Sequence, residues 1–332
     1  MVDLQDELTR IAALVDDYLL PRLASGRPKT LWEAAAHLPK MGGKKLRPFL
    51  TINVCKALRG REEDALPVGA AVELIQAFSL VHDDIIDNDL LRRGGPTVHS
   101  KWGNATAIVA GDLLHAKSYD LLTEAALQNP TITKILPNLL KELNIGTIRM
   151  CEGQQMDEEL ERSKKPSEQF YLEMIEKKTA ALFEVSTVMG AMLATPEQTV
   201  VEEMRLFGRN LGIGFQIADD ILGLVADEKE LGKPVGSDIR EGKNTILVIH
   251  ALSNVTQSSR RIILKALGNK KATAVQLKAA IREISASGAV EYAYQKAKRL
   301  EAAAVAQLSP LPDTEPKRLL KDALEFVLSR RY

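Results

Sequence analysis

Hydrophobic positions recur along this chain with the spacing of an α-helix. The pattern is clearest in three long segments: LQDELTRIAALVDDYLLPRL (4–23), EEDALPVGAAVELIQAFSLVHDDIID (62–87) and EQFYLEMIEKKTAALFEVSTVMGAML (168–193). Apolar residues return there every three or four positions, as on one face of a helix. The segments are rich in Ala and Leu, which favour helices, and Glu and Lys are frequent in the third. We therefore predict a helix over each.

Glycines and prolines separate the helical stretches, and no strand-like alternation or tandem repeat interrupts them. The main breaks fall at Gly42–Gly43, Gly94 to Pro96, Pro130, Pro166, Pro196, Gly232 to Pro234 and Pro310 to Pro312. No low-complexity linker divides the chain. We predict an all-α protein of about ten or more helices, folded as a single domain over residues 1–332.

Three aspartates interrupt the apolar pattern in FSLVHDDIIDNDLLRRGGPTVH (78–99). Asp83 and Asp87 are four residues apart and so share one helix face, while Asp84 lies on its flank. Two like charges this close repel unless a cation lies between them. Oxygen ligands favour magnesium, with manganese as an alternative. A solvated polar stripe near a helix end is the competing explanation, and this motif alone does not decide between them.

A second acidic motif and a set of basic residues favour the metal explanation. FQIADD (215–220) places Asp219 and Asp220 at the end of another apolar helix. A set of basic residues is expected in loops or at helix ends: Lys44, Arg47, Arg92, Arg93, Lys178, Lys233 and Lys243. Carboxylates that bind metal ions, together with cations that bind anions, predict a site for diphosphates.

Composition narrows the class of protein further. Lys+Arg and Asp+Glu both number 44, so no global positive charge argues for nucleic acid. Cys55 and Cys151 lack the spacing of metal ligands, and MVDLQDELTR lacks the features of a signal peptide. No uninterrupted apolar run reaches the roughly 18 residues of a transmembrane segment. We expect a cytoplasmic protein without a transmembrane segment.

The motifs in this order resemble those of the trans-type isoprenyl diphosphate synthases. The resemblance covers residues 20 to 250 and rests on GGKKLRP, FSLVHDDIIDNDLLRRGGPTVH, EGQQMD, KKTA, GFQIADDILGLVAD and GKPVGSDIREGKNT together. It implies an isoprenoid-synthase-type helical bundle around a deep central cavity, assembled as a homodimer. The implied substrates are isopentenyl diphosphate and an allylic diphosphate.

The resemblance also implies roles for particular residues. Three Mg²⁺ ions, or Mn²⁺ in their place, would be held by Asp83, Asp87 and Asp219, with Asp84 and Asp220 in support. The allylic diphosphate would also meet Arg92, Lys178, Lys233 and Lys243. Isopentenyl diphosphate would be bound by Lys44, Arg47, Arg93 and Gln76. Thr179 and Gln216 would lie beside the allylic cation, with a helix-capping threonine and a satisfied buried amide as the structural alternative. His82 and His99 are interpreted as structural neighbours.

The chain departs from the family pattern at two positions. Gly223 stands where many relatives have a third aspartate in the second acidic motif, so this motif offers fewer ligands. Gln76 replaces a histidine common in long-chain synthases, and an amide can still donate to a phosphate oxygen. The sequence around Gly223 is similar to archaeal short-chain members, which suggests synthesis of ether-lipid precursors.

Product length is expected to depend on the helix before the first aspartates. Ser79 lies one turn before Asp83, on the face of the cavity, and leaves the tunnel open. Phe78 lies on the flank and is expected to form a partial floor, unless it is simply a core residue. Within the family, a bulky residue beside a small one is similar to the twenty-carbon producers. Geranylgeranyl diphosphate is the expected product, and a bifunctional farnesyl/geranylgeranyl diphosphate synthase is the alternative.

Other classes of function make different predictions. A terpene cyclase would share the first acidic motif but would have no use for Lys44, Arg47 and Arg93 as a second diphosphate site. A catalytically silent partner subunit would typically lack one of the three aspartates, and this chain has all of them. A purely structural helical protein would not bind a diphosphate in a magnesium-dependent manner.

Overall fold

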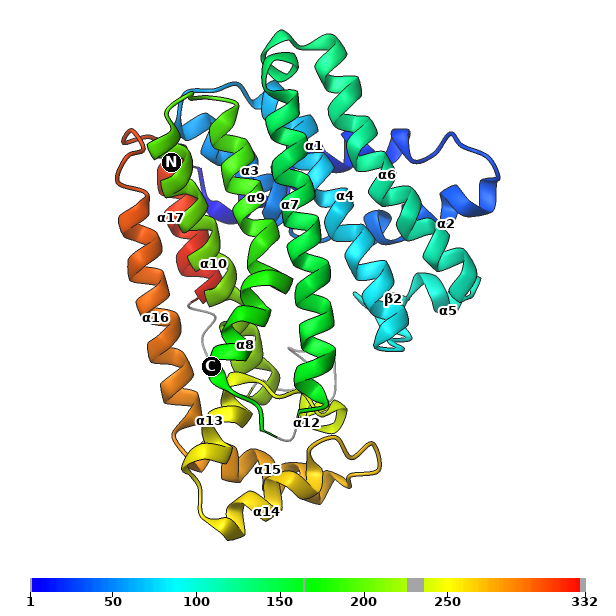
Figure 1. Cartoon of the computed structure of the whole chain (residues 1–332). Coiled ribbons are helices and arrows are strands. Elements are labelled where there is room, and N and C mark those ends of the chain that lie inside the picture. The colour runs from blue at the N-terminus through cyan, green and yellow to red at the C-terminus, as the bar shows by residue number, and fades with distance from the viewer. Residues whose placement is uncertain (1, 164, 226–235, 329–332) are drawn as a thin grey trace. The chain divides into compact units, whose positions relative to one another are not determined.

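The computed structural model describes residues 2–163, 165–225 and 236–328, and almost all regular structure in them is helical (Figure 1). The prediction of an all-α fold is confirmed. The helices are α1 (Leu4–Arg22), α2 (Lys29–Lys40), α3 (Leu46–Ala57), α4 (Glu62–Ile86), α5 (Val98–Trp102), α6 (Asn104–Gln128), α7 (Pro130–Glu161), α8 (Glu168–Ile175), the π-helix η1 (Glu176–Ala180), α9 (Ala181–Met192), α10 (Gln198–Val225), α12 (Ser237–Glu241), α13 (Ile246–Asn254), α14 (Gln257–Ala266), α15 (Ala274–Ala286), α16 (Ala289–Gln307) and α17 (Glu315–Leu328).

Side-chain caps fix where several helices begin. The Asp3 carboxylate accepts a hydrogen bond from the N–H of Gln5 at 2.9 Å and starts α1. At α15, Thr273 and Gln276 form a reciprocal capping box, in which each side chain accepts from the other's backbone N–H. Such caps satisfy N–H groups that the first helical turn leaves without a partner. The sequence therefore sets these boundaries locally.

The segment 168–193 does not form one regular α-helix. It divides into α8, η1 and α9, because residues Glu176–Ala180 adopt π-helical hydrogen bonding. A hydrophobic pattern does not distinguish a single π turn from the α-helix around it. The extra residue in this turn falls on the EKKTA motif.

A small hairpin follows α4. The pattern of hydrophobic residues did not predict this hairpin. Strands β1 (Leu91–Arg92) and β2 (Gly95–Pro96) pair antiparallel, with Leu91 opposite Pro96 and Arg92 opposite Gly95. The two turn residues, Arg93 and Gly94, have φ values of 51° and 76°. Two positive φ angles form the tight turn that matches the twist of a hairpin. Strands of two residues are too short to show alternation.

The chain divides into two compact units, and each is described by itself. Unit 1 contains residues 1–147, 182–208 and 307–323, and unit 2 contains residues 148–181, 209–306 and 324–332. The single domain expected from the sequence stays a prediction.

Helix α4 forms the centre of unit 1, packed against α3 and α6 (Figure 1). Its side chains Leu74 and Ile75 are fully buried, and each such side chain contributes about 1.5–3 kcal/mol. Within the described residues, α4 is the one helix long and apolar enough to cross a membrane. Of its most apolar stretch, 72% is buried inside the protein, as in the core helix of a globular unit.

Unit 2 has its own apolar core, to which α8, α10, α13 and α15 contribute. Tyr171 on α8 and Ile217 on α10 lie within it, and both are at most 1% exposed. This core fixes α8 and the C-terminal part of α10, which carry the second acidic motif and its neighbours.

Candidate active site

The first acidic motif ends α4, and its three aspartates differ in exposure. Asp83 is half-buried and Asp87 is exposed, whereas Asp84 is 1% exposed. The N–H of Asp87 donates to the Asp83 carbonyl at 2.8 Å, which keeps the last turn helical. Asp83 and Asp87 therefore leave the same helix face, one turn apart. The motif offers two accessible carboxylates and buries the third.

Asp84 is anchored by the hairpin. Nε of Arg92 donates to Oδ1 of Asp84 at 2.6 Å. Burial raises the pKa of Asp84, and the Arg92 guanidinium opposes this rise only in part. A buried carboxylate without such a cation would be strongly destabilising. In this structure Arg92, which the resemblance places at the allylic diphosphate, also holds Asp84 in place.

The glycines of GGKKLRP make room for Arg93. A Cβ on Gly43 would lie 2.9 Å from the Arg93 guanidinium, which also donates to the Gly42 carbonyl. Arg93 is exposed as a whole residue, but its guanidinium lies against the two glycines. Desolvation of the guanidinium therefore lowers the pKa of Arg93. Arg93 also lines a small cavity of about 10 Å³ together with Glu73 and Gln76. The glycine pair therefore forms a cradle for this cation.

Arg47 lies on α3 with its guanidinium 4.6 Å from the centre of the Phe183 ring. Its Nε is buried and has no hydrogen-bond partner in the described part of the chain. Burial lowers the pKa of Arg47 to about 10, so the side chain remains a cation at neutral pH. A buried donor without a partner suits a site that binds an anion. Lys44 is exposed at the start of the same motif.

Lys45 is a residue whose importance the sequence did not reveal. Its side chain is 1% exposed and forms ion pairs with Asp16 at 3.2 Å and Glu73 at 3.4 Å. Its φ of 45° is also unusual for a residue other than glycine. Lys45 thus ties the GGKKLRP turn to α1 and α4, whereas the neighbouring Lys44 faces solvent. The sequence KK gives no signal that separates the two.

Phe78 lies on α4 among imidazole rings. The ring centre of Phe78 is 4.9 Å from that of His82 and 5.2 Å from that of His115 on α6. Ser79 is buried, and its hydroxyl donates to the Gln76 carbonyl at 3.0 Å. These contacts hold the Phe78 ring in place at the α4–α6 contact.

The two histidines of the motif have local partners. Nε2 of His82 lies 3.0 Å from the Ile108 carbonyl, and Nδ1 of His99 lies 3.1 Å from the Thr97 hydroxyl. Both contacts fit the structural role expected from the sequence.

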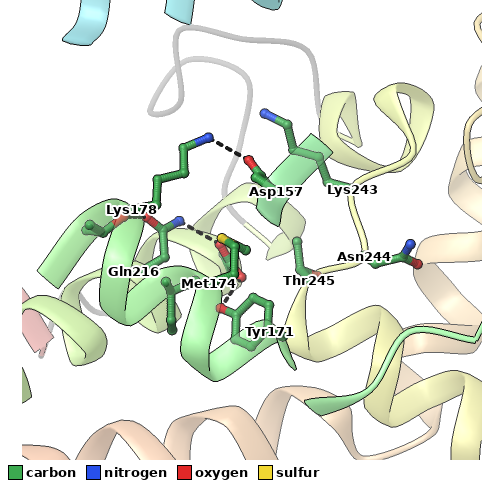
Figure 2. A pocket seen from close by; sticks show the side chains of 11 residues that line it. Asp157, Tyr171, Met174, Lys178, Gln216, Lys243, Asn244 and Thr245 are labelled. Atoms are coloured by element: carbon green, nitrogen blue, oxygen red, sulfur yellow. Dashed lines mark hydrogen bonds and ion pairs between the residues drawn. The ribbon is translucent and has the colours of Figure 1, made fainter. Parts of the chain in front are cut away.

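In unit 2, the π-helix places Lys178 and Thr179 at the edge of a cavity of about 90 Å³ (Figure 2). Close packing of α7 makes this possible, because a Cβ on Gly153 would lie 2.1 Å from the backbone nitrogen of Lys178. One turn further along α7, Oδ2 of Asp157 accepts from Nζ of Lys178 at 2.5 Å. The EGQQMD motif therefore supplies both the close approach and the partner of the lysine.

A chain of hydrogen bonds crosses this cavity. The Thr179 hydroxyl donates to Oε1 of Gln216 at 2.8 Å, and Nε2 of Gln216 donates to Oδ1 of Asp220 at 2.9 Å. The hydroxyl of Tyr171 donates to the other oxygen of Asp220 at 2.6 Å. Figure 2 shows Tyr171 and Gln216 converging from different helices. Gln216 is thus fixed at both ends of its amide.

The second acidic motif repeats the division seen in the first. Asp220 is 7% exposed, whereas Asp219 is exposed. Burial raises the pKa of Asp220 to about 7, against the two hydrogen bonds that it accepts. The carboxylates of Asp238 and Asp219 add to the rise by repulsion. In both motifs, one buried carboxylate is anchored beside a more accessible one: Asp84 beside Asp83 and Asp87, and Asp220 beside Asp219.

The remaining basic residues expected at the site divide into two cases. Lys243 is half-buried and lines the same cavity as Asp220, with Nζ 3.2 Å from Oε2 of Glu241. Lys233 lies outside the described residues. Asn244 follows Lys243 and donates to the Leu160 carbonyl at 2.7 Å, which fixes the path of the chain.

The donor set suits a hard divalent cation. Within the described residues, no three or more His, Cys, Asp and Glu side chains are grouped so that they could hold a metal ion by themselves. Magnesium is usually bound by one or two carboxylates together with substrate phosphates and water. Asp83 with Asp87, and Asp219 with its anchored neighbour, provide oxygen ligands of this kind.

Comparison with known proteins identifies the family. The family model described as polyprenyl synthetase matches residues 28–284. The chain belongs to the polyprenyl synthetase family. It is 45% identical to a geranylgeranyl diphosphate synthase of Sulfolobus acidocaldarius over 322 residues, 96% of each chain. It is also 38% identical to a geranylfarnesyl diphosphate synthase of Aeropyrum pernix, over 96% of this chain and 99% of that one.

The solved structures agree with this membership. A geranylgeranyl pyrophosphate synthetase from Pyrococcus horikoshii is 37% identical, with a TM-score of 0.91 over 98% of this chain and 99% of that one. The isoprenoid-synthase fold and the enzyme class predicted from the sequence are therefore confirmed. Polyprenyl synthetases generally use a divalent metal such as Mg²⁺.

Sequence reasoning missed two residues of the unit 2 cavity. Asp157 stood within EGQQMD without a role, and Tyr171 lay in an apolar segment without a motif. The position of Asp157 in a conspicuous polar motif was a usable signal. Nothing in the sequence distinguishes Tyr171 from a core aromatic residue.

Proposed function

We propose that this protein is a prenyltransferase that condenses isopentenyl diphosphate head-to-tail with allylic diphosphates and mainly makes geranylgeranyl diphosphate. Family membership over most of the chain supports the reaction class. One structural observation carries the assignment of residues. Each acidic motif anchors one buried aspartate and keeps at least one more accessible aspartate beside it.

The accessible aspartates Asp83, Asp87 and Asp219 hold three Mg²⁺ ions in this proposal, with Mn²⁺ as an alternative. Ions held by these residues would supply positive charge to the diphosphate of the allylic substrate. Asp84 and Asp220 support them, because each is locked by hydrogen bonds that fix its helix end. Further positive charge comes from Arg92, Lys178, Lys233 and Lys243.

Lys178, Thr179 and Gln216 act where the carbon–oxygen bond of the allylic substrate breaks. Asp157 orients the Lys178 ammonium, which binds the diphosphate as it leaves. Thr179 and Gln216 are held together at 2.8 Å, so their dipoles are already oriented beside the allylic cation. The departing diphosphate takes the final proton, and the reaction needs no nucleophile from the enzyme.

Isopentenyl diphosphate binds Lys44, Arg47, Arg93 and Gln76 in unit 1. Two observations support this assignment: the buried Nε of Arg47 is a donor without a partner in the described residues, and the Arg93 guanidinium lies against Gly43. Arginine guanidinium groups can bind diphosphate oxygens in pairs. Holding this substrate places its alkene within reach of the allylic cation.

Product length is set by Phe78 with Ser79 beside it. The contacts of Phe78 with His82 and His115 support a fixed floor rather than a mobile side chain. The 45% identity to a geranylgeranyl diphosphate synthase supports the twenty-carbon product. A mixture of fifteen- and twenty-carbon products is the alternative.

The wider setting is also part of the proposal. We expect a cytoplasmic homodimer that supplies precursors of archaeal ether lipids. The relatives from Sulfolobus acidocaldarius and Aeropyrum pernix support the part of this proposal that concerns archaeal lipids. Sedimentation analysis of the purified protein tests the dimer directly, because a monomer and a dimer differ twofold in mass.

The central test supplies Mg²⁺, labelled isopentenyl diphosphate and, separately, allylic starters of five, ten and fifteen carbons. The products are dephosphorylated and sized, with the Asp83→Ala variant as control. A dominant twenty-carbon alcohol is expected from the wild-type protein. Cyclic hydrocarbons made without consumption of isopentenyl diphosphate would indicate a cyclase. No product at all would indicate a silent partner subunit.

A further inference from the structure

Helices α14 and α15 of unit 2 carry a local excess of positive charge. They pack against each other, and with the loop between them they form residues 257–286, called here the α14–α15 hairpin (Figure 1). The hairpin contains one acidic residue, Glu283, and seven basic residues: Arg260, Arg261, Lys265, Lys270, Lys271, Lys278 and Arg282. The whole chain has 44 residues of each sign, so the hairpin departs strongly from the overall balance.

The seven basic residues of the hairpin are all exposed. None of them forms an ion pair with a carboxylate in the parts of the chain that the structure describes. On the next helix, α16, the lysines differ: Lys296 pairs with Glu168, and Lys298 pairs with Glu301 at 2.7 Å. Surface cations without such partners raise the local positive potential and attract anions.

The outward face of α14 combines these cations with an apolar side chain. Ile263 and Ala266 are fully buried in the unit 2 core and define the inward face of the helix. Arg261, Leu264 and Lys265 are spaced by three and four residues on the opposite face. Leu264 is 48% exposed, although a leucine of a core-facing helix normally points inward.

Helix α15 has the same arrangement. Leu277 and Ile284 are buried in the unit 2 core. Val275, Lys278 and Arg282 share the opposite face at intervals of three and four residues. Val275 is 78% exposed. Each helix of the hairpin therefore presents one apolar side chain and two cations on its outward face.

We propose that the α14–α15 hairpin binds the surface of an anionic lipid bilayer. Cations on such a surface are attracted by the lipid phosphates, and exposed apolar side chains between them enter the boundary between headgroups and acyl chains. Residues 257–286 contain no Phe, Tyr or Trp, the side chains on which unpaired nucleic-acid bases stack. The combination of apolar side chains and cations therefore favours lipid over single-stranded nucleic acid as the partner.

The test measures cosedimentation of the full chain with vesicles, without any prenyl substrate. One set of vesicles contains only phosphatidylcholine, and the other contains phosphatidylcholine mixed with anionic phosphatidylglycerol. The wild-type protein is expected to bind the anionic vesicles at least about tenfold more tightly than the neutral ones. This preference should shrink as salt is added, because salt screens charges at a surface.

Two pairs of substitutions compare cations inside and outside the hairpin. Arg261→Gln with Lys265→Gln is expected to weaken binding to anionic vesicles by about tenfold or more, since each cation near such a surface contributes about fivefold. The matched control is Lys134→Gln with Arg299→Gln, which removes the same charge from exposed positions on α7 and α16. The control is expected to bind like the wild-type protein. Circular dichroism checks that both variants remain folded.

A third variant tests the apolar contribution. Leu264→Ser with Val275→Ser keeps every charge and is expected to weaken binding by about fivefold, because these side chains no longer gain from leaving water. This loss should persist at high salt, whereas the loss caused by removing the cations should not.

Several results would overturn the inference. One is equal binding of the wild-type protein to both kinds of vesicle. A second is an equal loss of binding in the control and in the Arg261 and Lys265 variant. A third is tighter binding to a single-stranded RNA oligonucleotide than to the anionic vesicles, with the same dependence on Arg261 and Lys265, which would assign the hairpin to nucleic acid.

This inference and the proposed function are tested separately. A protein that makes the prenyl product but does not bind anionic vesicles refutes only the role of the hairpin. A protein that binds the vesicles but makes no product refutes only the proposed reaction.

Discussion

Tyr171→Phe isolates the hydroxyl that anchors Asp220. The variant removes one oxygen from a side chain that is 1% exposed, so the ring keeps its packing. It deletes the 2.6 Å hydrogen bond to Oδ2 and leaves Gln216, at 2.9 Å, as the other partner. A hydrogen bond to a charged group contributes about 1.5–3 kcal/mol. We expect the free energy of unfolding to fall by about 2 kcal/mol when Asp220 is ionised.

The size of this loss depends on pH. Burial raises the pKa of Asp220 to about 7. The Asp220 carboxyl itself therefore stabilises the fold at acidic pH, where it is neutral, and this stabilisation is lost as the pH rises through about 7 and the carboxyl ionises. The Tyr171 hydroxyl lowers this pKa by stabilising the ionised form. Tyr171→Phe should therefore cost about 2 kcal/mol at about pH 8.5 and about 1 kcal/mol at about pH 5.5, where the carboxyl is neutral.

Urea unfolding followed by far-ultraviolet circular dichroism at the two pH values measures both losses. Tyr119→Phe is the matched control, because its hydroxyl donates at 2.6 Å to Oδ1 of Asn144, a neutral acceptor. The control should lose the same free energy at both pH values. Equal losses for Tyr171→Phe at the two values, or a larger loss at acidic pH, would refute the description of Asp220 as a buried, anchored carboxylate.

Three further predictions follow from the other sites. Asp83→Ala should lower turnover by about 10²–10³-fold or more with an unchanged circular dichroism spectrum, and wild-type steady-state rates would rule out a metal-binding role for Asp83. Phe78→Ala should lengthen the prenyl product by at least one five-carbon unit, because it removes the ring that His82 and His115 hold; an unchanged chromatographic profile would place the floor elsewhere. Arg92→Leu should destabilise the protein by about 3 kcal/mol in urea unfolding, because it leaves Asp84 buried without its cation. Since burial raises the pKa of Asp84 and Arg92 opposes that rise, this loss should grow as the pH rises, and a loss that shrinks would contradict the assignment.

Local pattern was sufficient for the helices whose periodicity runs without interruption. The predicted segments 4–23 and 62–87 correspond to α1 (Leu4–Arg22) and α4 (Glu62–Ile86), each within one residue at either end. Few structures other than an α-helix are compatible with an amphipathic or fully apolar repeat of this length. The cap of α1 is also local, because Asp3 directly precedes the helix in the sequence. The motifs were also sufficient for the family, because their residue types and order are themselves sequence properties.

Elements that depend on backbone geometry were less visible. The π-helical turn at Glu176–Ala180 has the same hydrophobic pattern as an α-helix, and the close packing of its backbone against Gly153 is visible only in the tertiary structure. The hairpin depends on positive φ at Arg93 and Gly94, in strands too short for any pattern. Both elements lie at residues expected to bind substrate.

The sequence by itself determined that this protein is a helical polyprenyl synthetase with two acidic motifs and a particular set of cations. It could not rank the carboxylates, because adjacent aspartates are chemically identical until the fold surrounds them. Tertiary structure decided that Asp84 is buried against Arg92 and Asp220 against Tyr171. It also placed Asp238 of α12 in the space left by Gly223 of α10. Burial and the contacts between helices set the charge state and orientation of a carboxylate, and these depend on residues that are distant in the chain.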